Sequence, residues 1–386
     1  AWVLSPMASE IEAQAVRWMA QLVGMPDGTG GLLVSGGNMA NTVGFWAARA
    51  AAGERWSVRA RGMAGGAPPM RVYASAETHT WVQKASDLAG MGTDSVRWIP
   101  TDGEQRMDLD ALRRAIADDR EGGDVPMMVV GTAGSVSTGA VDPLGDIAAI
   151  CRDEDIWFHV DGAYGGFAAA SPLAPEALRE LARADSVAID PHKWLYAPLE
   201  AGCLLVRDPG RLRAAFAYHP PYYHFGSEVT NFVDLGPQNS RGFRALKVWM
   251  QLRQAGRAGY AEMISDDIRL ARRLDERVRE TPELEGGPGG LSIATFRYVP
   301  PELAEGVGTA DVEARLEALN REIQARMERG GSAFVSNAVV GERYLLRACI
   351  VNINTRPEDI DALPALAVEL GREVWRSGTH TSNKER

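Results

Sequence analysis

Two reactive side chains follow two neighbouring apolar segments of the sequence. Asp161 comes directly after the largely apolar run 156–160, and Lys193 comes shortly after a second run at 186–189. Both runs are short and contain β-branched residues, which is typical of buried strands in a parallel sheet. Because ligands bind beyond the carboxyl ends of such strands, we expect Asp161 and Lys193 to face one crevice. Taken alone, an acid and a lysine at two strand ends more often form a salt bridge.

The same two residue types are what pyridoxal 5′-phosphate (PLP) requires. The lysine amine condenses with the aldehyde of PLP, and the carboxylate keeps the ring nitrogen protonated so that the ring accepts electrons. A phosphate site is predicted at Ser35-Gly36-Gly37-Asn38, a turn between a short strand and a helix. The exposed N–H groups and the dipole at the start of a helix attract an anion, although a simple helix cap at Asn38 explains the same residues.

The sequence around these residues resembles the group II PLP-dependent amino-acid decarboxylases, a family that includes the aromatic amino-acid and glutamate enzymes. The similarity lies in His-Val-Asp-Gly-Ala-Tyr-Gly-Gly at 159–166, Asp-Pro-His-Lys-Trp at 190–194 and Arg-Gly-Phe-Arg-Ala-Leu-Lys-Val-Trp at 241–249, and it extends over most of the chain. It implies an α/β protein with the PLP-dependent transferase fold type I. The pattern of apolar segments agrees, since it predicts a seven-stranded, mostly parallel sheet followed by a smaller C-terminal α+β domain.

The resemblance implies roles for individual residues around PLP. Lys193 would hold the cofactor, Asp161 would pair with its ring nitrogen, and His79 would stack on the ring, although an isolated histidine there also suits a helix cap. The other cofactor residues implied are Gly37, Asn38, Ser135, Ala163, Asp190 and His192. Asn38 departs from the small or hydroxyl residue usual in the family, and Asp190 stands where the family often has asparagine.

One position raises the question of which reaction is catalysed. Counted without gaps from 241–249, the family tyrosine that returns a proton to the substrate's Cα corresponds to Phe232, which has no acidic proton. Relatives with phenylalanine there are associated with decarboxylation-dependent oxidation to an aldehyde, ammonia and peroxide. A shift of register would instead assign the proton to Tyr222, Tyr223 or His224. We expect simple decarboxylation to the amine and CO2, the commoner activity of the fold, with an aldehyde synthase as the alternative.

The expected substrate is an aromatic L-amino acid. Ser240 occupies a position where plant relatives tend to have serine with phenolic substrates and glycine with indolic ones, which favours tyrosine, dopa or phenylalanine. Family members also carry an N-terminal segment that wraps the partner subunit and contributes to the substrate pocket. Trp2 matches the last residues of that segment, so we expect part of the pocket to be missing here. The resemblance therefore implies a homodimer with its active site at the subunit interface.

Three alternatives remain open at this point. Glutamate as substrate would call for a basic group in the pocket, which a missing segment could supply. An aminotransferase would hold the substrate carboxylate with an arginine such as Arg297 or Arg347, but the Asp-Pro-His-Lys-Trp sequence argues against that class. A PLP-binding protein with little turnover is the non-enzymatic alternative, although it would not require the complete set of Asp161, His192, Lys193 and His79.

The composition limits the classes of partner and the cellular compartment that we expect. The net charge of −10 argues against nucleic acids and anionic membranes as partners, and no apolar run approaches the ~20 residues of a membrane span. Three widely separated cysteines in apolar settings suggest a reducing cytoplasm. A metal site is not expected, because His159 and His192 have no second ligand at helical spacing.

The order of segments predicts the domain organisation. We expect an N-terminal helix at 1–25, a large PLP-binding domain at 26–280, a small α+β domain at 281–376 and a polar tail at 377–386. The glycine-rich stretch that follows residue 281 is expected to link the two domains.

Overall fold

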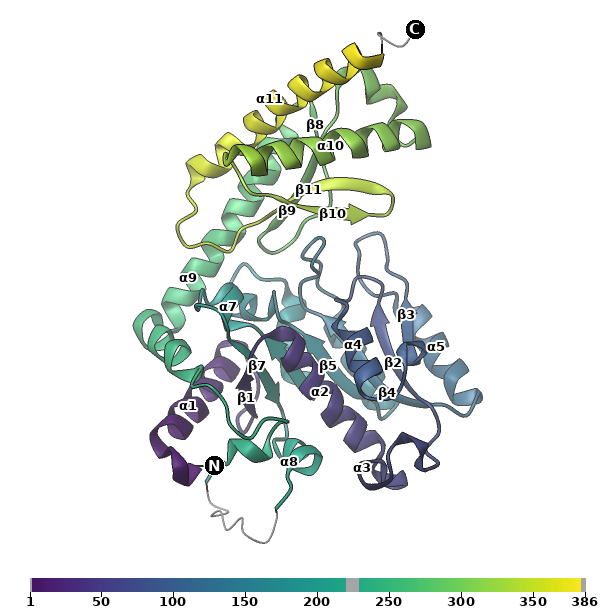
Figure 1. Ribbon diagram of the computed structural model, residues 1–386, viewed down its shortest axis with the longest axis vertical. Coiled ribbons are helices and arrows are strands. Elements are labelled where there is room, and N and C mark those ends of the chain that lie inside the picture. The colour runs from purple at the N-terminus through teal and green to yellow at the C-terminus, as the bar shows by residue number, and fades with distance from the viewer. Residues whose placement is uncertain (1, 220–228, 383–386) are drawn as a thin grey trace. The chain divides into compact units, whose positions relative to one another are not determined.

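The computed structural model describes residues 2–219 and 229–382 and divides into two compact units (Figure 1). The first unit comprises Ala1–Val136 and Val141–Ile264, and the second comprises Ser137–Ala140 and Ser265–Arg386. The expected tyrosine and histidine alternatives at 222–224 lie outside the described residues. No helix in the described part of the chain combines the length and the hydropathy that a membrane-spanning helix needs.

The division falls within helix α9 (Ala245–Arg279), closer to the N-terminus than the expected boundary at residue 280. This helix is interrupted at Gly256, whose φ of 63° suits glycine. Beyond it, the Tyr260 hydroxyl still donates to the backbone carbonyl of Leu195 in the first unit. Leu274 and Val278, about four and five turns further along, belong to the hydrophobic core of the second unit. The change from one core to the other sets the boundary.

The first unit is built on a seven-stranded sheet with the order β1-β7-β6-β5-β4-β2-β3. Its strands are β1 (Gly30–Val34), β2 (Met70–Ser75), β3 (Val96–Ile99), β4 (Val125–Thr132), β5 (Trp157–Asp161), β6 (Ser186–Ile189) and β7 (Gly202–Val206). Only β7 runs against its neighbours, so the other six strands point the same way. The predicted seven-stranded, mostly parallel sheet is therefore confirmed.

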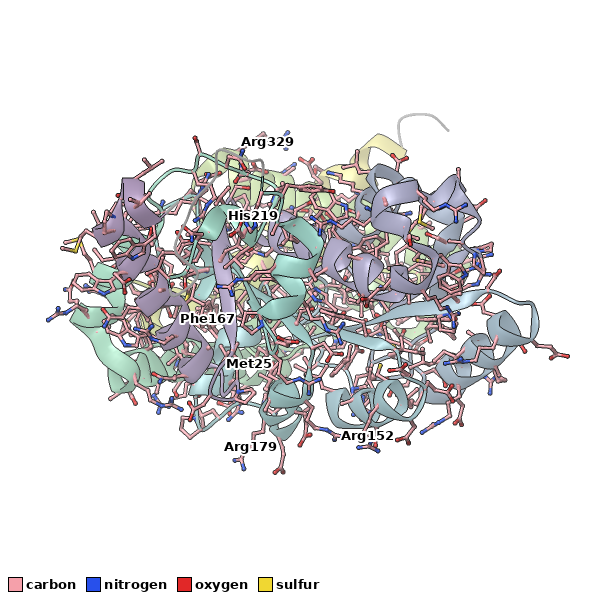
Figure 2. The ribbon with its side chains drawn as sticks, turned by 90° about the horizontal axis from the view of Figure 1, so that it is seen from below. Met25, Arg152, Phe167, Arg179, His219 and Arg329 are labelled. Atoms are coloured by element: carbon pink, nitrogen blue, oxygen red, sulfur yellow. The ribbon has the colours of Figure 1, made fainter. Side chains whose placement is uncertain are left out.

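Helices connect the parallel strands and cover the sheet. They are α2 (Gly37–Ala52), α3 (Val58–Arg61), α4 (Trp81–Leu88), α5 (Leu109–Glu121), α6 (Leu144–Asp153), α7 (Pro191–Trp194) and α8 (Gly210–Phe216). Figure 2 shows the resulting layering, with Phe167 fully buried and Arg152 and Arg179 extending from the surface. Helix α1 (Pro6–Leu22) also packs on this unit: Glu12 accepts a hydrogen bond from the backbone N–H of Leu33 in β1. The first helix is thus part of the large unit and not a separate domain.

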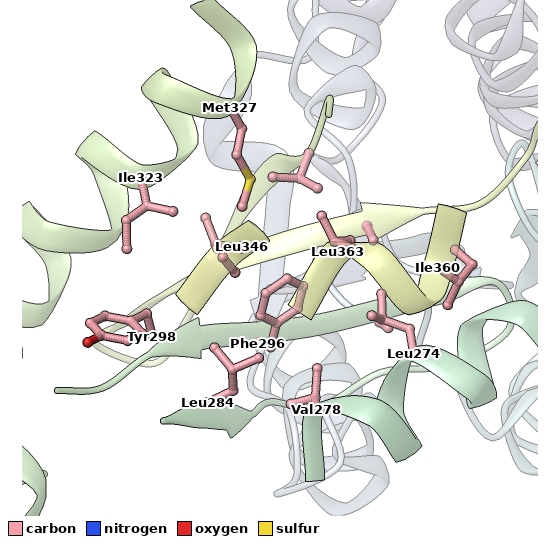
Figure 3. Close-up of a cluster of buried hydrophobic side chains, with 14 of the residues drawn as sticks. Leu274, Val278, Leu284, Phe296, Tyr298, Ile323, Met327, Leu346, Ile360 and Leu363 are labelled. Carbon is pink, nitrogen blue, oxygen red and sulfur yellow. The ribbon is translucent and has the colours of Figure 1, made fainter. Parts of the chain in front are cut away.

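The second unit is a four-stranded antiparallel sheet covered by helices. The strand order is β10-β11-β9-β8, with β8 (Leu284–Gly286), β9 (Ile293–Tyr298), β10 (Ser336–Val340) and β11 (Arg343–Cys349). Helices α10 (Ala310–Gly330) and α11 (Pro357–Ser382) pack on it and enclose one hydrophobic core (Figure 3). Helix α11 continues to Ser382, so residues 377–382 of the expected polar tail are helical. Within this helix the Ser377 hydroxyl donates to the backbone carbonyl of Val374.

The core of the second unit provides a stability prediction. Phe296 in β9 is fully buried among the side chains shown in Figure 3. Phe296→Ala removes an aromatic ring from a closed core and is expected to lower the free energy of unfolding by about 3–5 kcal/mol. Chemical denaturation followed by circular dichroism measures this change. Phe334→Ala is the matched control, because Phe334 of the same unit is 79% exposed and should change stability little.

Candidate active site

A cavity opens at the edge where the carboxyl ends of the parallel strands meet. The residues that line it come from the segments after β1, β2, β4, β5 and β6: Gly37, Asn38, Asn41, Glu77, His79, Thr132, Gly134, Val136, Asp161, Ala163, Tyr164 and Lys193. The sequence had assigned six of them to the cofactor, namely Gly37, Asn38, His79, Asp161, Ala163 and Lys193. The two reactive residues therefore share one cavity, as the sequence predicts.

Lys193 lies on the short helix α7, immediately after β6. Its Nζ is 3.1 Å from Oδ2 of Asp190, the residue between the strand and the helix. The Asp190 side chain is almost wholly buried, and burial raises its pKa, while the charge of Lys193 acts in the opposite direction. The second oxygen of Asp190, Oδ1, has no hydrogen-bond partner among the described residues. Asp190 thus anchors Lys193 and retains an unused acceptor.

His192 has a defined tautomer. Its Nδ1 accepts a hydrogen bond of 3.0 Å from the backbone N–H of Ala201. When the imidazole is neutral, the proton is therefore on Nε2. Nε2 is 3.5 Å from Oδ2 of Asp190, so this donor lies beside the same carboxylate as Lys193.

Asp161 sits at the end of β5 with both oxygens engaged. Oδ2 accepts a hydrogen bond of 2.8 Å from the indole N–H of Trp81, and Oδ1 accepts one of 3.1 Å from the backbone N–H of Ala163. The side chain is 8% exposed and borders the cavity. These two donors come from different elements and fix the plane of the carboxylate, which can then meet a cation inside the cavity.

The start of helix α2 provides the expected anion site. Gly37 is its first residue, and Gly36 before it contributes no side-chain cap, so the N–H groups of the first turn are open to a ligand. A Cβ atom on Gly37 would lie 2.6 Å from Oδ2 of Asp190 and 2.8 Å from Cβ of Ala163. Only glycine lets the helix approach these two residues so closely.

These features fit PLP. The uncapped helix suits its phosphate, Lys193 suits its aldehyde, and the fixed carboxylate of Asp161 suits its ring nitrogen. At the same place, Oδ1 of Asp190 can still accept a hydrogen bond and Nε2 of His192 can donate one. No group of three or more histidine, cysteine, aspartate or glutamate side chains within the described ranges could hold a metal ion.

Six expected site residues are not among those that line the cavity: Asp190 and His192, which lie beside Lys193, and Ser135, Ser240, Trp2 and Phe232. Ser135 is buried, although its neighbours Gly134 and Val136 line the cavity. Ser240 is exposed on the surface. Trp2 lies near Phe232, because its backbone N–H donates to Oδ1 of Asn231.

Phe232 itself is buried beside strand β1, packed with Leu32 and Leu235. The guanidinium of Arg241 lies 5.0 Å from the centre of its ring. Arg241 is held in turn by Glu12, with N–O distances of 2.7 and 2.8 Å. Phe232 thus packs in an apolar cluster and does not line the cavity that contains Lys193 of its own chain.

Several cavity residues were not predicted from the sequence. Of the lining residues, Glu77 lies two positions before the expected His79, and Tyr164 belongs to the motif that contains Asp161. Trp81, two positions after His79, does not line the cavity but donates a hydrogen bond to Asp161 from behind it. Tyr164 stacks on Trp194, the residue that follows Lys193, with ring centres 5.1 Å apart. Proximity in sequence to an assigned residue was the available signal for all three.

Comparison with known proteins gives a consistent result. Residues 1–286 match the family model "Pyridoxal-dependent decarboxylase conserved domain". An aromatic-L-amino-acid decarboxylase of Bacillus atrophaeus is 34% identical over 380 residues, covering 97% of this chain and 75% of the relative. A 4-hydroxyphenylacetaldehyde synthase of Rhodiola rosea is 30% identical over 382 residues, covering 97% and 75%. The crystal structure of Oryza sativa tryptophan decarboxylase with PLP and tryptamine superimposes with a TM-score of 0.88 at 32% identity, covering 96% of this chain and 77% of that one.

Proposed function

The chain belongs to the family of pyridoxal-dependent decarboxylases, and from this premise we propose that it converts an aromatic L-amino acid to the amine and CO2. PLP is the cofactor, and its ring, when bound, accepts the electron pair left behind as CO2 departs. The observation that carries the proposal is the shared cavity of Asp161 and Lys193 beside an uncapped helix start. The aromatic substrate is supported by relatives that are named for aromatic amino acids or their products. Within that class we propose tyrosine, dopa or phenylalanine as the substrate, and not an indolic amino acid.

We assign the residues as follows. Lys193 holds the cofactor, and Asp190 keeps the lysine amine oriented across 3.1 Å. Asp161 would keep a proton on the ring nitrogen, and His79 and the small Ala163, which line the same cavity, would border the ring. The phosphate is held by Gly37, Asn38 and His192, with Ser135 close by.

We also propose a cytoplasmic homodimer in which the partner completes each active site. Phe232, Trp2 and Ser240 do not line the cavity of their own chain, so a role for them requires a second subunit. Apolar side chains are exposed near the start of the chain and on α9, including Leu4 at 82% and Met250 at 58%. Burial of these side chains would favour association. Light scattering after gel filtration should give twice the mass of the chain, and a monomer that is fully active would contradict the proposal.

The direct test is aerobic incubation of the PLP-loaded protein with a panel of L-amino acids. Tyrosine, dopa, phenylalanine, tryptophan and glutamate are supplied separately, and CO2, amine, aldehyde and peroxide are measured together. We expect CO2 and amine in equal amounts from the phenolic substrates. Release of CO2 from glutamate alone would overturn the aromatic assignment. Retained PLP without CO2 from any substrate would indicate a PLP-binding protein.

An aldehyde synthase is the second candidate, favoured by Phe232 and by the similarity to the Rhodiola rosea enzyme. In that case aldehyde and peroxide would appear in step with CO2. Phe232→Tyr would then add an acidic hydroxyl at the family's proton-donating position and is expected to shift the products toward the amine. The ratio of amine to aldehyde, measured by chromatography, checks this prediction.

Phe216→Tyr is the control for this substitution. Phe216 on α8 packs edge-on against Trp46, away from the cavity, so the added hydroxyl should leave the product ratio unchanged. An unchanged ratio in Phe232→Tyr as well would mean that the residue does not decide the reaction.

A further inference from the structure

Trp81 is a buried tryptophan that contacts two of the residues expected to hold the cofactor. Its indole N–H donates to Oδ2 of Asp161 at 2.8 Å, and its backbone N–H donates to Nδ1 of His79 at 3.2 Å. The side chain is fully buried, at 0% exposure, within the core between α4 and the sheet. One residue therefore fixes both the carboxylate at the edge of the cofactor site and the imidazole beside it.

The indole N–H is a donor that cannot accept, and an ionised carboxylate is an acceptor that cannot donate. The indole N–H can donate to either oxygen of the charged carboxylate but only to the carbonyl oxygen of the neutral acid, and the hydrogen bond to the charged form is stronger. A charged Asp161 is the form that keeps a proton on the ring nitrogen of PLP. The hydrogen bond from Trp81 thus favours the negative charge of Asp161, which is the form of the carboxylate that the cofactor needs.

His159, which also contacts Trp81, is not a cation that could compete with the cofactor for Asp161. His159 lies edge-on to the indole, with ring centres 5.6 Å apart, and is fully buried. Burial lowers its pKa to about 4, so the imidazole is neutral at pH 7.

Its hydrogen bonds agree with a single neutral tautomer. Nε2 donates to Oδ1 of Asn41 at 2.7 Å, so Nδ1 of the neutral ring has no proton and accepts from the hydroxyl of Ser186 at 2.7 Å. The oxygen of that hydroxyl accepts the indole N–H of Trp157. Among the described residues, the hydrogen bonds to the carboxylate of Asp161 come from the N–H groups of Trp81 and Ala163.

We propose that Trp81 is a positioning residue that acts through Asp161 to keep the ring nitrogen of PLP protonated. This inference rests on the PLP dependence of the family and not on the identity of the substrate. Its tests need no substrate, so failure of the aromatic decarboxylase proposal and failure of this inference can be told apart.

The first measurement is the ring-nitrogen proton itself. The holoenzyme is loaded with PLP labelled with ¹⁵N in the ring, and the chemical shift is followed against pH. Trp81→Phe keeps an aromatic side chain but removes the donor. It is expected to lose the ring proton about one pH unit below the wild type and to bind PLP about ten-fold more weakly, the usual effect of losing a hydrogen bond to a charged group.

Two variants separate the hydrogen bond from packing. In Trp81→His the five-membered ring places Nε2 where the indole has Nε1, so the donor is kept although more volume is lost. If the hydrogen bond matters, the pH profile of Trp81→His lies closer to the wild type than that of Trp81→Phe. If packing matters, the order is reversed and the proposal fails. Trp157→Phe, which removes the indole donor to Ser186 instead, should leave the profile in place.

A double variant tests whether Trp81 acts through Asp161. In an Asp161→Asn background, Trp81→Phe is expected to cause no further loss of PLP affinity, because the charged acceptor is already absent. Additive losses would show that the tryptophan acts independently and would overturn the inference.

Discussion

Lys193→Ala is expected to abolish turnover, with a loss of at least about a thousand-fold, and to abolish the visible absorbance of lysine-bound PLP. Lys193 borders the cavity together with Asp161 and His79, and its amine is 3.1 Å from Oδ2 of Asp190. Alanine removes the amine that holds the cofactor aldehyde. It also leaves the buried Asp190 carboxylate without this cation, so PLP affinity should fall as well.

The lysine that binds PLP can be identified readily, because the chain contains four lysines: Lys84, Lys193, Lys247 and Lys384. Borohydride reduction followed by peptide mass spectrometry should find the cofactor on Lys193 in the wild type and on no lysine in Lys193→Ala. Lys84→Ala is the matched control, since Lys84 is exposed on α4 and does not line the cavity. Wild-type turnover in Lys193→Ala would refute the assignment of this residue.

The sheet and the reactive pair could be predicted from the sequence because their signals are local. Strands β5 and β6 are short apolar runs, and Asp161 and Lys193 come at or just after their ends. In a parallel sheet, strand ends meet at one edge, so sequence order alone brought the two side chains together. The glycine turn before α2 was equally local, since a phosphate site at a helix start needs no distant partner.

Contacts between distant segments could not be predicted in this way. The hydrogen bond between Trp81 and Asp161 joins residues 80 positions apart. Nothing in the local sequence around Trp81 indicates which residue it contacts. Phe232 likewise lies in a segment without periodicity, and its position depends on Arg241 and on Glu12 of the first helix. Ungapped alignment assigned it a catalytic position, whereas the packing of an apolar ring places it beside β1.

The second large effect is expected from Asp161→Asn, a change that preserves the shape of the side chain. The carboxylate accepts one hydrogen bond on each oxygen, from Trp81 and from Ala163. An amide has a single acceptor oxygen, so its NH2 group must face one of these two N–H donors. The variant also lacks the charge that stabilises a protonated ring nitrogen. We expect turnover to fall roughly 10²- to 10³-fold, and the ring nitrogen of bound PLP to be unprotonated at pH 7.

Asp142→Asn is the matched control, because it also leaves two N–H donors facing an amide, at a position that does not itself line the cavity. Asp142 is buried, and its two oxygens accept the backbone N–H groups of Met107 and Thr132 at 2.7 Å each. Burial raises the pKa of Asp142 to about 6, so its carboxyl is largely charged at pH 7, as the comparison requires. Both asparagine variants should lower the melting temperature, but only Asp161→Asn should change the ¹⁵N signal of the cofactor ring. Equal changes in both variants would mean that loss of packing, and not loss of the charge beside PLP, explains the defect.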